Sequence, residues 1–284
     1  MVDTVLSGGW IIDGTRTPPY QADLCIQDGK IVAISPQWEG NCRTRVDVTG
    51  KIVSPGFIDI HTHSDTCPFS AVFPESKVAQ GITLEIVGNC GVSAVPILPS
   101  CQAEQTAYLR KISEIPVPEE AVRDASVQKY AAHVAQTGYP SHLGTLIGQG
   151  TLRAGIVGFQ DRPLTPSEME QMKFLLDDQL NQGALGLSLG LIYPPGSFSP
   201  TSELRELARV VQKHKKILAV HMRNEGPNIF QAVEEMLSIA EETGVHLHIS
   251  HLKLMGKAQW GQAPRLLERI EASRQRGAVV TCDQ

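Results

Sequence analysis

The sequence predicts an α/β fold in which a mostly parallel sheet is crossed by helices. From residue 56 onward, short apolar runs alternate with amphipathic segments, an alternation typical of strand–helix–strand units. Several runs are apolar almost throughout, as strands buried on both faces are. The candidate strands are 57–61, 82–88, 143–148, 185–191, 217–222, 246–250 and 278–282.

Residues 1–55 are predicted to form a small β-sheet domain, with 56–284 as the larger domain. Two short apolar runs, 24–27 and 30–34, flank Asp28-Gly29, a dipeptide that favours a two-residue hairpin turn. The first domain therefore begins with short antiparallel strands rather than with a crossover helix.

The helices of the larger domain have recognisable ends. Thr165-Pro166-Ser167-Glu168 is a capping box with proline at the first helical position. Two further helices, at about 228–243 and 264–276, each stop at a glycine. The proline-containing stretch 97–130 should be partly helix and partly loop.

Seven strands can make a doubly wound sheet, but they cannot close a (β/α)8 barrel, because closure pairs the last strand with the first. The sequence stops directly after the seventh run, so a barrel would be one truncated at that point. Such an open barrel exposes two unpaired edges, and we expect low solubility, or an oligomer that covers the open edges.

Composition excludes several classes of function. The 25 Lys+Arg and 30 Asp+Glu residues leave a formal charge of −5 without runs of like charge, which argues against nucleic-acid binding and a polybasic membrane surface. No apolar stretch reaches the roughly 18–20 residues of a bilayer span. Without a recognisable secretory signal, we expect a cytoplasmic protein whose six cysteines are mostly reduced.

The strongest chemical signal is GFIDIHTHSD at 56–65. Residues two apart in a strand point to the same side, so His61 and His63 can place two imidazoles on one metal ion. Two unrelated loop histidines are the alternative, but their position at the end of an apolar strand favours a metal site.

Cys90, His221 and His251 follow other predicted strands at the same relative place, the rim where barrel enzymes hold their active sites. Taken singly, each has an ordinary explanation as a buried thiol or a hydrogen-bonded imidazole. Together they form a donor set that suits zinc, and a thiolate can bridge two metals. Structural or solvent roles are assigned to the remaining histidines, namely His133, His142, His214, His246 and His248.

Other polar residues near these strand ends are candidate substrate contacts. Tyr193 lies in the glycine-rich segment 183–196, whose glycines allow close backbone approach, and it could hydrogen-bond a substrate or simply pack. Lys253 could hold a carboxylate as a point charge, or be solvated. Arg223 and Glu225 could contact substrate or orient the metal ligands.

Together these motifs resemble the amidohydrolase superfamily and, within it, the N-acyl-D-amino-acid deacylases (D-aminoacylases). The HxH motif marks only the superfamily, whereas GNCG combined with SHLK is specific to the deacylase branch. The matching stretches cover the whole chain: GFIDIHTHSD at 56–65, GNCGVSAVP at 88–96, GALGLSLGLIYPPG at 183–196, HMRNEG at 221–226, SHLKLMGKAQWG at 250–261 and CDQ at 282–284.

The resemblance implies a (β/α)8 TIM-type barrel of the amidohydrolase kind, here truncated after its seventh strand, beside a small N-terminal β-domain that C-terminal strands complete. It implies one tightly bound Zn²⁺ and a second, weaker metal position. The tight zinc would be held by Cys90, His221 and His251, with Cys90 able to bridge to the second position at His61 and His63. Substrate contacts would come from Tyr193, Lys253 and Arg223.

The implied reaction is hydrolysis of small-molecule N-acyl-D-amino acids to a carboxylate and a D-amino acid. Zinc lowers the pKa of its water to about 7, so metal-bound hydroxide can attack the amide carbonyl. A general acid must then protonate the leaving amine. The family places that aspartate on the eighth strand, beyond Gln284, and neither Asp65 nor Asp283 occupies the position.

Two alternatives remain open. One is a hydantoinase- or dihydroorotase-like amidohydrolase, although those enzymes usually bridge their metals with a modified lysine where this chain has Cys90. The other is a metal-binding fragment without catalytic activity.

Overall fold

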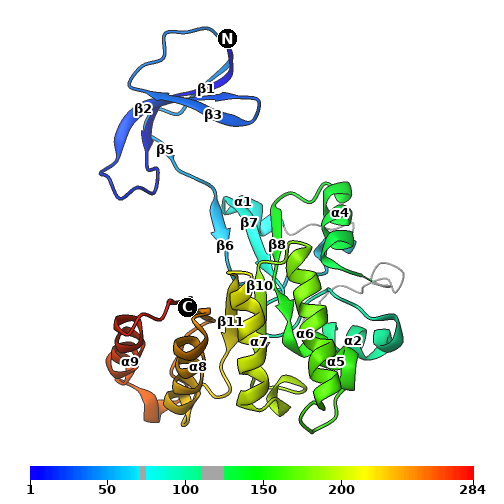
Figure 1. Cartoon of the computed structure of the whole chain (residues 1–284). Helices are drawn as coiled ribbons and strands as arrows, with labels where there is room; N and C mark the ends of the chain where they lie inside the picture. Colours follow the sequence, from blue (N-terminus) through cyan, green and yellow to red (C-terminus); the bar gives the residue numbers. More distant parts are fainter. Residues whose placement is uncertain (71–74, 111–124) are drawn as a thin grey trace. The chain divides into compact units, whose positions relative to one another are not determined.

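The computed structural model of the chain describes residues 1–70, 75–110 and 125–284 (Figure 1). The chain divides into two compact units, Met1–Phe57 and Ile58–Gln284. No helix within the described residues is both long and apolar enough to cross a membrane. Part of the predicted helix-and-loop stretch, 111–124, lies outside the described residues.

The first unit is a five-stranded sheet in the order β3-β2-β1-β4, with β5 also paired to β1. The predicted hairpin joins β2 and β3, and Asp28 and Gly29 both have positive φ, as a two-residue turn of this kind requires. The strands are β1 Val2–Ile11, β2 Tyr20–Gln27, β3 Lys30–Ser35, β4 Cys42–Asp47 and β5 Ile52–Val53.

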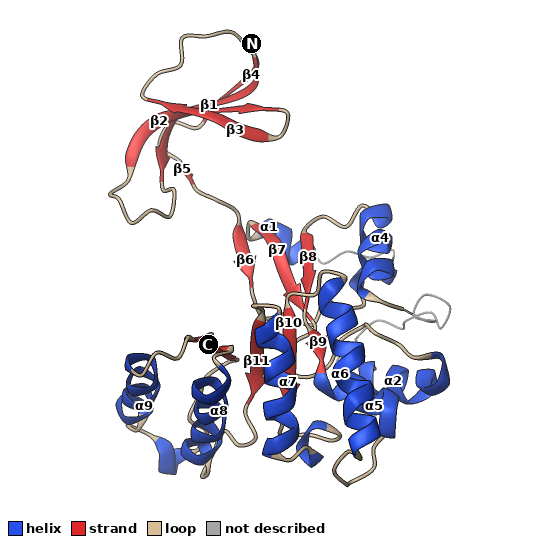
Figure 2. Cartoon of the chain, viewed as in Figure 1, coloured by secondary structure: helices blue, strands red, loops and turns tan. Residues whose placement is uncertain are grey.

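The second unit contains a three-stranded sheet, β6-β7-β8, and a five-stranded sheet, β13-β12-β11-β10-β9. Figure 2 labels the first of these sheets and the strands β9, β10 and β11 of the second. Pairs within the five-stranded sheet and the β7–β8 pair run parallel. The strands are β6 Phe57–Asp59, β7 Ile82–Val87, β8 His142–Thr145, β9 Ile147–Gly148, β10 Gly186–Gly190, β11 Ile217–His221, β12 His246–Ile249 and β13 Val280–Cys282.

The structure corrects the predicted strand 143–148, which is divided at Leu146 into β8 and β9. The amide of Leu146 still donates to the Val87 carbonyl at 2.9 Å, whereas Ile147 already pairs with Leu187 of β10. This stretch therefore passes from one sheet to the other and connects them. The division is a consequence of changing partners, which hydrophobic periodicity does not register.

The described strands do not close into a barrel. Among the described strands, β6 and β13 have no pairing with each other, and each ends its sheet. The predicted strand 57–61 is also shorter than expected and ends at Asp59, whose side chain accepts a hydrogen bond from the amide of His61 at 3.2 Å. The observed architecture is an α/β fold with its parallel strands in an open series.

Helices accompany the strands as the alternating pattern predicts. The capping box is confirmed: Thr165 Oγ1 accepts from the amide of Glu168, and the Glu168 carboxylate accepts from the amide of Thr165. The helices are α1 Glu75–Ala79, α2 Gln102–Leu109, α4 Val127–Thr137, α5 Gln149–Val157, α6 Pro166–Asn181, α7 Thr201–Lys213, α8 Ile229–Thr243 and α9 Ala263–Gln275, with 3₁₀ turns at Cys67–Phe69, Pro99–Cys101, Gly196–Phe198 and Lys257–Gln259.

The main core lies between the helices and the strands of the second unit. Successive helices from α5 to α8 lie side by side (Figure 1). Leu176 of α6, Leu207 of α7 and Met236 of α8 are fully buried together with Leu218 and Leu247 of the strands. This packing fixes the strands, and with them the loops at their carboxyl ends.

A charged pair is buried within the helical layer. Nη1 of Arg153, on α5, lies 2.7 Å from Oε2 of Glu203, on α7, and the two side chains are 0% and 3% exposed. Ser199 and Gln149 also donate to the Glu203 carboxylate, at 2.7 and 3.2 Å. Both charges are thus compensated by neighbours, as buried charges must be.

We expect Glu203→Ala to lower the free energy of unfolding by about 3–5 kcal/mol, because it leaves the Arg153 guanidinium buried without its partner. Urea unfolding followed by circular dichroism measures the change. The matched control is Arg209→Ala, which breaks the half-exposed Arg209–Glu242 pair and should cost at most about 1 kcal/mol. Equal losses in the two variants would contradict the prediction.

Close backbone approach at Gly190 positions the loop after β7. A Cβ added to Gly190 would collide with the carbonyl oxygen of Cys90, and one added to Gly91 would lie 2.5 Å from the Gly190 amide nitrogen. This confirms the predicted role of the glycine-rich segment in allowing two backbones to touch.

Gly190→Ala should therefore displace the loop that carries Cys90 and destabilise the fold by about 1–3 kcal/mol, as overpacking does. Thermal unfolding is a suitable measurement. Gly226→Ala is the control, since its added Cβ would meet no atom closer than Met255 O at 3.6 Å. A Gly190→Ala protein that is as stable as the Gly226→Ala protein would show that the contact is not rigid.

Candidate metal centre

The predicted metal ligands lie at the carboxyl ends of the parallel strands. His61 follows β6, Cys90 follows β7, His221 is the last residue of β11, and His251 follows β12. Because these ends meet at one rim, residues distant in sequence come together there.

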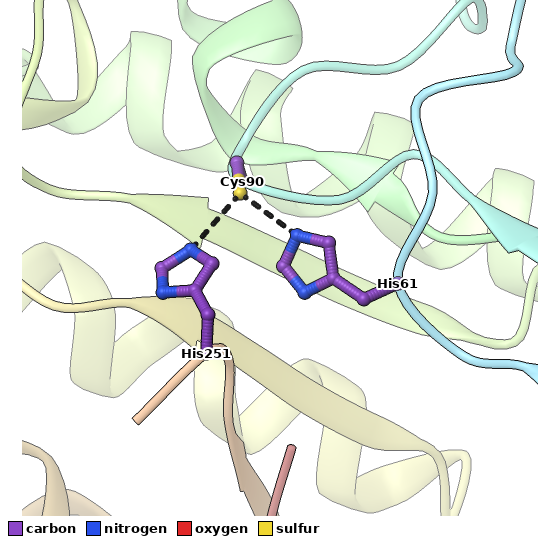
Figure 3. Close-up of side chains that lie close together, drawn as sticks. All are labelled: His61, Cys90 and His251. Atoms are coloured by element: carbon purple, nitrogen blue, oxygen red, sulfur yellow. Dashed lines mark hydrogen bonds between the residues drawn. The ribbon is translucent and has the colours of Figure 1, made fainter. Parts of the chain in front are cut away.

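Cys90 lies between two imidazoles (Figure 3). Its Sγ is 3.2 Å from Nε2 of His61 and 3.5 Å from Nε2 of His251. The ring of His221 lies 4.4 Å from that of His251, and the ring of His63 lies 5.6 Å from that of His61, between centroids. The structure thus brings all five predicted ligands to one region, although their roles as ligands stay predictions.

Two of these residues have unusual backbone conformations. Cys90 has φ 53° and His251 has φ 37°, in the left-handed region that residues other than glycine seldom adopt. Ser188 anchors the Cys90 loop, because its Oγ accepts from the Gly91 amide at 3.0 Å and donates to the Gly88 carbonyl. The His251 amide donates to the Asp283 carboxylate. Such conformations persist where surrounding contacts hold them, often at functional sites.

The surroundings of Cys90 favour the thiolate. Burial opposes ionisation, but the surrounding imidazoles of His221, His251, His61 and His63 outweigh it and lower the pKa of the Cys90 thiol to about 2. A thiolate is the form of cysteine that binds metal. The site therefore presents a negatively charged sulfur without needing a base to deprotonate it.

His61 shows the reciprocal effect. Burial lowers its pKa, but hydrogen bonds to Asp283 and Cys90 outweigh burial and raise the pKa to about 9. An imidazole must lose its second proton to bind a metal, so metal binding at His61 would release a proton at neutral pH.

Each inner imidazole has an outer partner. Nδ1 of His61 lies 3.1 Å from Asp283 Oδ2, and Nδ1 of His251 lies 3.1 Å from Glu225 Oε1. Nε2 of both rings is left facing Cys90. This is the arrangement in which a metal-ligating histidine donates its other N–H to a carboxylate.

The donor set fits zinc. His61, Cys90 and His251 offer ligand atoms within 4.8 Å of one another, and thiolate with imidazole is a zinc-type combination. Two further imidazole nitrogens, His221 Nε2 and His63 Nδ1, are buried without a hydrogen-bond partner among the described residues. A metal ion would satisfy such nitrogens, which are costly to bury unpaired.

A second group, His221, Glu225 and His251, also offers ligand atoms within 4.8 Å of one another and could hold a metal ion. Lys253 argues against a metal ion at this second group, because Lys253 Nζ lies 2.5 Å from Glu225 Oε1. The ammonium already compensates that carboxylate, so Glu225 is better suited to hold His251 than to bind the ion itself.

The predicted substrate contacts have partners within the protein. Tyr193 donates to the Cys90 carbonyl at 3.0 Å, and Lys253 lies 3.0 Å from His251 Nδ1 in addition to its pair with Glu225. Arg223 is held by Glu235 at 3.0 Å and donates to two backbone carbonyls of residues 197–199. Their roles toward a substrate stay predictions.

Asp283 and His248 also contribute to the site, in ways that the sequence pattern did not indicate. His248 Nε2 lies 3.2 Å from Asp283 Oδ2, so of the structural and solvent roles left open for this histidine it has the structural one, in the network around the site. In a continuous strand, His248 would alternate out of phase with His251 and point away from it. However, β12 ends at Ile249 and His251 has a left-handed backbone, so strand alternation does not extend to His251. The available signal was the position of Asp283, directly after the seventh strand.

Burial opposes ionisation of Asp283, but hydrogen bonds from His248, His61 and the His251 amide outweigh it and hold its pKa well below the usual range. The carboxylate is therefore charged at neutral pH, and it can keep accepting all of these bonds.

Comparison with known proteins identifies the family. A model described as "Amidohydrolase family" matches residues 44–275. The chain is 35% identical to the D-aminoacylase of Alcaligenes xylosoxydans xylosoxydans over 277 residues, covering 98% of this chain and 56% of that protein. The chain thus spans about half the length of the curated relatives it matches.

Solved structures agree. An N-acyl-D-glutamate deacylase from Bordetella bronchiseptica, complexed with zinc and a phosphonate inhibitor, matches with a TM-score of 0.89 and 36% identity over 99% of this chain and 58% of that one. A D-aminoacylase structure concerned with a binuclear metal centre matches with a TM-score of 0.87 and 35% identity over 100% of this chain and 58% of that one. The chain therefore belongs to the amidohydrolase family, and its homologues within it are the N-acyl-D-amino-acid deacylases.

Proposed function

We propose that the chain carries the zinc centre of an N-acyl-D-amino-acid deacylase. The observation that supports this most directly is the Cys90 thiolate, whose Sγ lies 3.2 and 3.5 Å from two imidazole nitrogens in a chain of this family. Cys90, His221 and His251 would hold one zinc tightly, and His61 and His63 would form a second, weaker position that shares Cys90.

Zinc would supply an activated water at neutral pH and would polarise the amide carbonyl of the substrate. The protein's own groups would bind and orient the substrate. Tyr193 suits a donor role, because burial first and the nearby Cys90 thiolate second raise the pKa of its hydroxyl well above the usual value and keep it protonated. Its hydroxyl also lies 3.5 Å from His221 Nδ1, at the edge of the centre.

Lys253 suits the carboxylate of the substrate. Its side chain is 41% exposed and its ammonium lies beside His251 and Glu225, so Lys253 is accessible at the rim while it remains next to the metal ligands. A substrate carboxylate would share this ammonium with Glu225. Arg223 would act from further out, because its guanidinium is already engaged by Glu235.

Protonation of the leaving amine requires a further group. The family resemblance assigns this step to an aspartate on an eighth strand, and the strands within the described residues do not include that position. We therefore propose that full turnover depends on a carboxylate supplied from an eighth strand, which would lie between β6 and β13 and complete a (β/α)8 barrel. In its absence, we expect the two open edges to promote oligomerisation.

A cyclic-amide hydrolase of the hydantoinase or dihydroorotase type is the second candidate. It is less supported, because the family resemblance implies a modified lysine at the metal-bridging position of those enzymes, whereas this chain has Cys90 there. A metal-binding protein without catalysis is the third candidate, and the experiments below separate the three.

We expect the purified protein to bind zinc. Cys90→Ala should lose the tightly bound ion, because the Cys90 thiolate is the proposed ligand that both zinc positions have in common. Zinc content after gel filtration, measured by atomic absorption, provides the test. Cys282→Ala, at an exposed cysteine, should keep the wild-type content. A zinc-free wild type, or a Cys90→Ala variant with undiminished zinc, would contradict the ligand assignment.

The activity is tested with N-acetyl-D-methionine, its L-isomer and a hydantoin. We expect hydrolysis of the D-isomer in preference to the other two, and the highest rate from a version of this chain extended through the eighth strand of a D-aminoacylase. Release of free amino acid measures turnover. Faster opening of the hydantoin would favour the second candidate, and equal turnover with and without the extension would show that the eighth-strand aspartate is dispensable.

A further inference from the structure

We infer that Asp283 is a positioning residue of the zinc centre, which holds the His61 ring and the His251 backbone at once and so presents one imidazole to each of the two proposed zinc positions. The inference rests on the proposed zinc centre and goes beyond it, because it assigns a role to a residue that binds neither zinc nor substrate. It also gives a function to His248, which the proposed mechanism does not use.

The contacts converge on one carboxylate. Oδ2 of Asp283 lies 3.1 Å from His61 Nδ1 and 3.2 Å from His248 Nε2, while Oδ1 accepts from the amide of His251. The Asp283 side chain is 13% exposed. Charge-assisted hydrogen bonds of this kind, shielded from water, are about twice as strong as neutral ones.

The bond to His61 determines which ring nitrogen faces the metal. Because Asp283 accepts from Nδ1 of His61, the other ring nitrogen, Nε2, is the one that faces the centre, 3.2 Å from Cys90 Sγ, and that is left to bind a metal. Without the carboxylate, the ring could rotate or take the other tautomer, and either change would remove a ligand from its productive position.

The bond to His251 supports an unfavourable backbone. His251 has φ 37°, and its amide donates to Asp283 while its Nε2 faces Cys90 at 3.5 Å. Left-handed residues other than glycine cost of order 1–3 kcal/mol and persist only where neighbours over-determine them. Asp283 is such a neighbour, so it holds the second imidazole through the main chain.

Asp283 is itself fixed from outside. His248 Nδ1 lies 2.9 Å from Thr281 Oγ1, which in turn lies 3.0 Å from His246 Nε2. The Asp283 backbone is also held, since its amide donates to Ile249 at 3.2 Å and its carbonyl accepts from Leu252 at 2.9 Å. The carboxylate is therefore a rigid support.

The same carboxylate joins the two ends of the open strand series. His61 follows β6 and Asp283 follows β13, and these strands are not paired with each other among the described elements. The His61–Asp283 contact crosses that gap at the rim. His61 therefore depends on Asp283 for support from that side.

The test measures zinc affinity rather than turnover. Asp283→Asn keeps the shape of the side chain, but its amide group has only one oxygen that can accept hydrogen bonds, where the carboxylate has two. We therefore expect zinc affinity to fall about 10–100-fold. Competition with a chromophoric chelator gives the dissociation constant, and the visible spectrum of the Co²⁺-loaded protein should show an altered ligand field. Asp177→Asn is the matched control, because Asp177 accepts from His214 Nε2 at 2.8 Å away from this centre.

His248→Gln is the second variant and leaves the carboxylate in place. If Asp283→Asn fails to fold by circular dichroism, His248→Gln still tests the inference, and we expect it to weaken zinc binding and to alter the Co²⁺ spectrum in the same direction. The inference is supported when both carboxylate-network variants bind zinc more weakly than Asp177→Asn.

Three results overturn parts of the argument separately. A wild type without zinc would overturn the proposed function itself. Wild-type zinc affinity in Asp283→Asn, or in His248→Gln when only that variant folds, would overturn the positioning role alone and leave the zinc centre intact. Complete zinc loss in Asp283→Asn with unchanged binding in His248→Gln would identify Asp283 as a direct ligand, which also overturns it.

Discussion

A buried thiolate surrounded by imidazoles is the constraint on which the rest of the site depends. An anion enclosed by protein costs several kcal/mol unless neighbouring groups compensate it. At Cys90 the compensation comes from His61 and His251, whose Nε2 atoms lie 3.2 and 3.5 Å from Sγ. His221 and His63 also favour the thiolate. These histidines come from the ends of three strands, β6, β11 and β12, so the charge of one sulfur atom requires the strand ends to meet with accurate geometry.

The fold meets this requirement with backbone contacts rather than with bulky side chains. Gly190 of β10 lies against the Cys90 carbonyl, and Ser188 on the same strand binds the backbone on both sides of Cys90. The loop is therefore fixed by its neighbour strand, and the strand is fixed by the helical layer packed behind it. Stability and chemistry are coupled here, because a group too large for this contact displaces the sulfur.

Outer carboxylates complete the arrangement. Asp283 and Glu225 take the Nδ1 side of His61 and His251, and Lys253 neutralises Glu225. The inner sulfur and the outer carboxylates therefore enclose the imidazoles between negative groups. In the absence of a metal, a proton on His61 balances part of this charge, as the raised pKa of His61 indicates. A divalent ion would replace that positive charge, so metal binding would be coupled to proton release.

The sequence by itself determined the alternation of strands and helices, the ends of several helices, and the residue types that follow the strands, because these depend on local periodicity and capping. His61, Cys90, His221 and His251 were recognised since each is a metal-binding type at an equivalent position. Only the tertiary structure decided the division at Leu146, the open edges of β6 and β13, and the pairing of His61 with Asp283 across 222 residues. Such features depend on which distant segments meet, and neither side-chain alternation nor motif spacing carries that information.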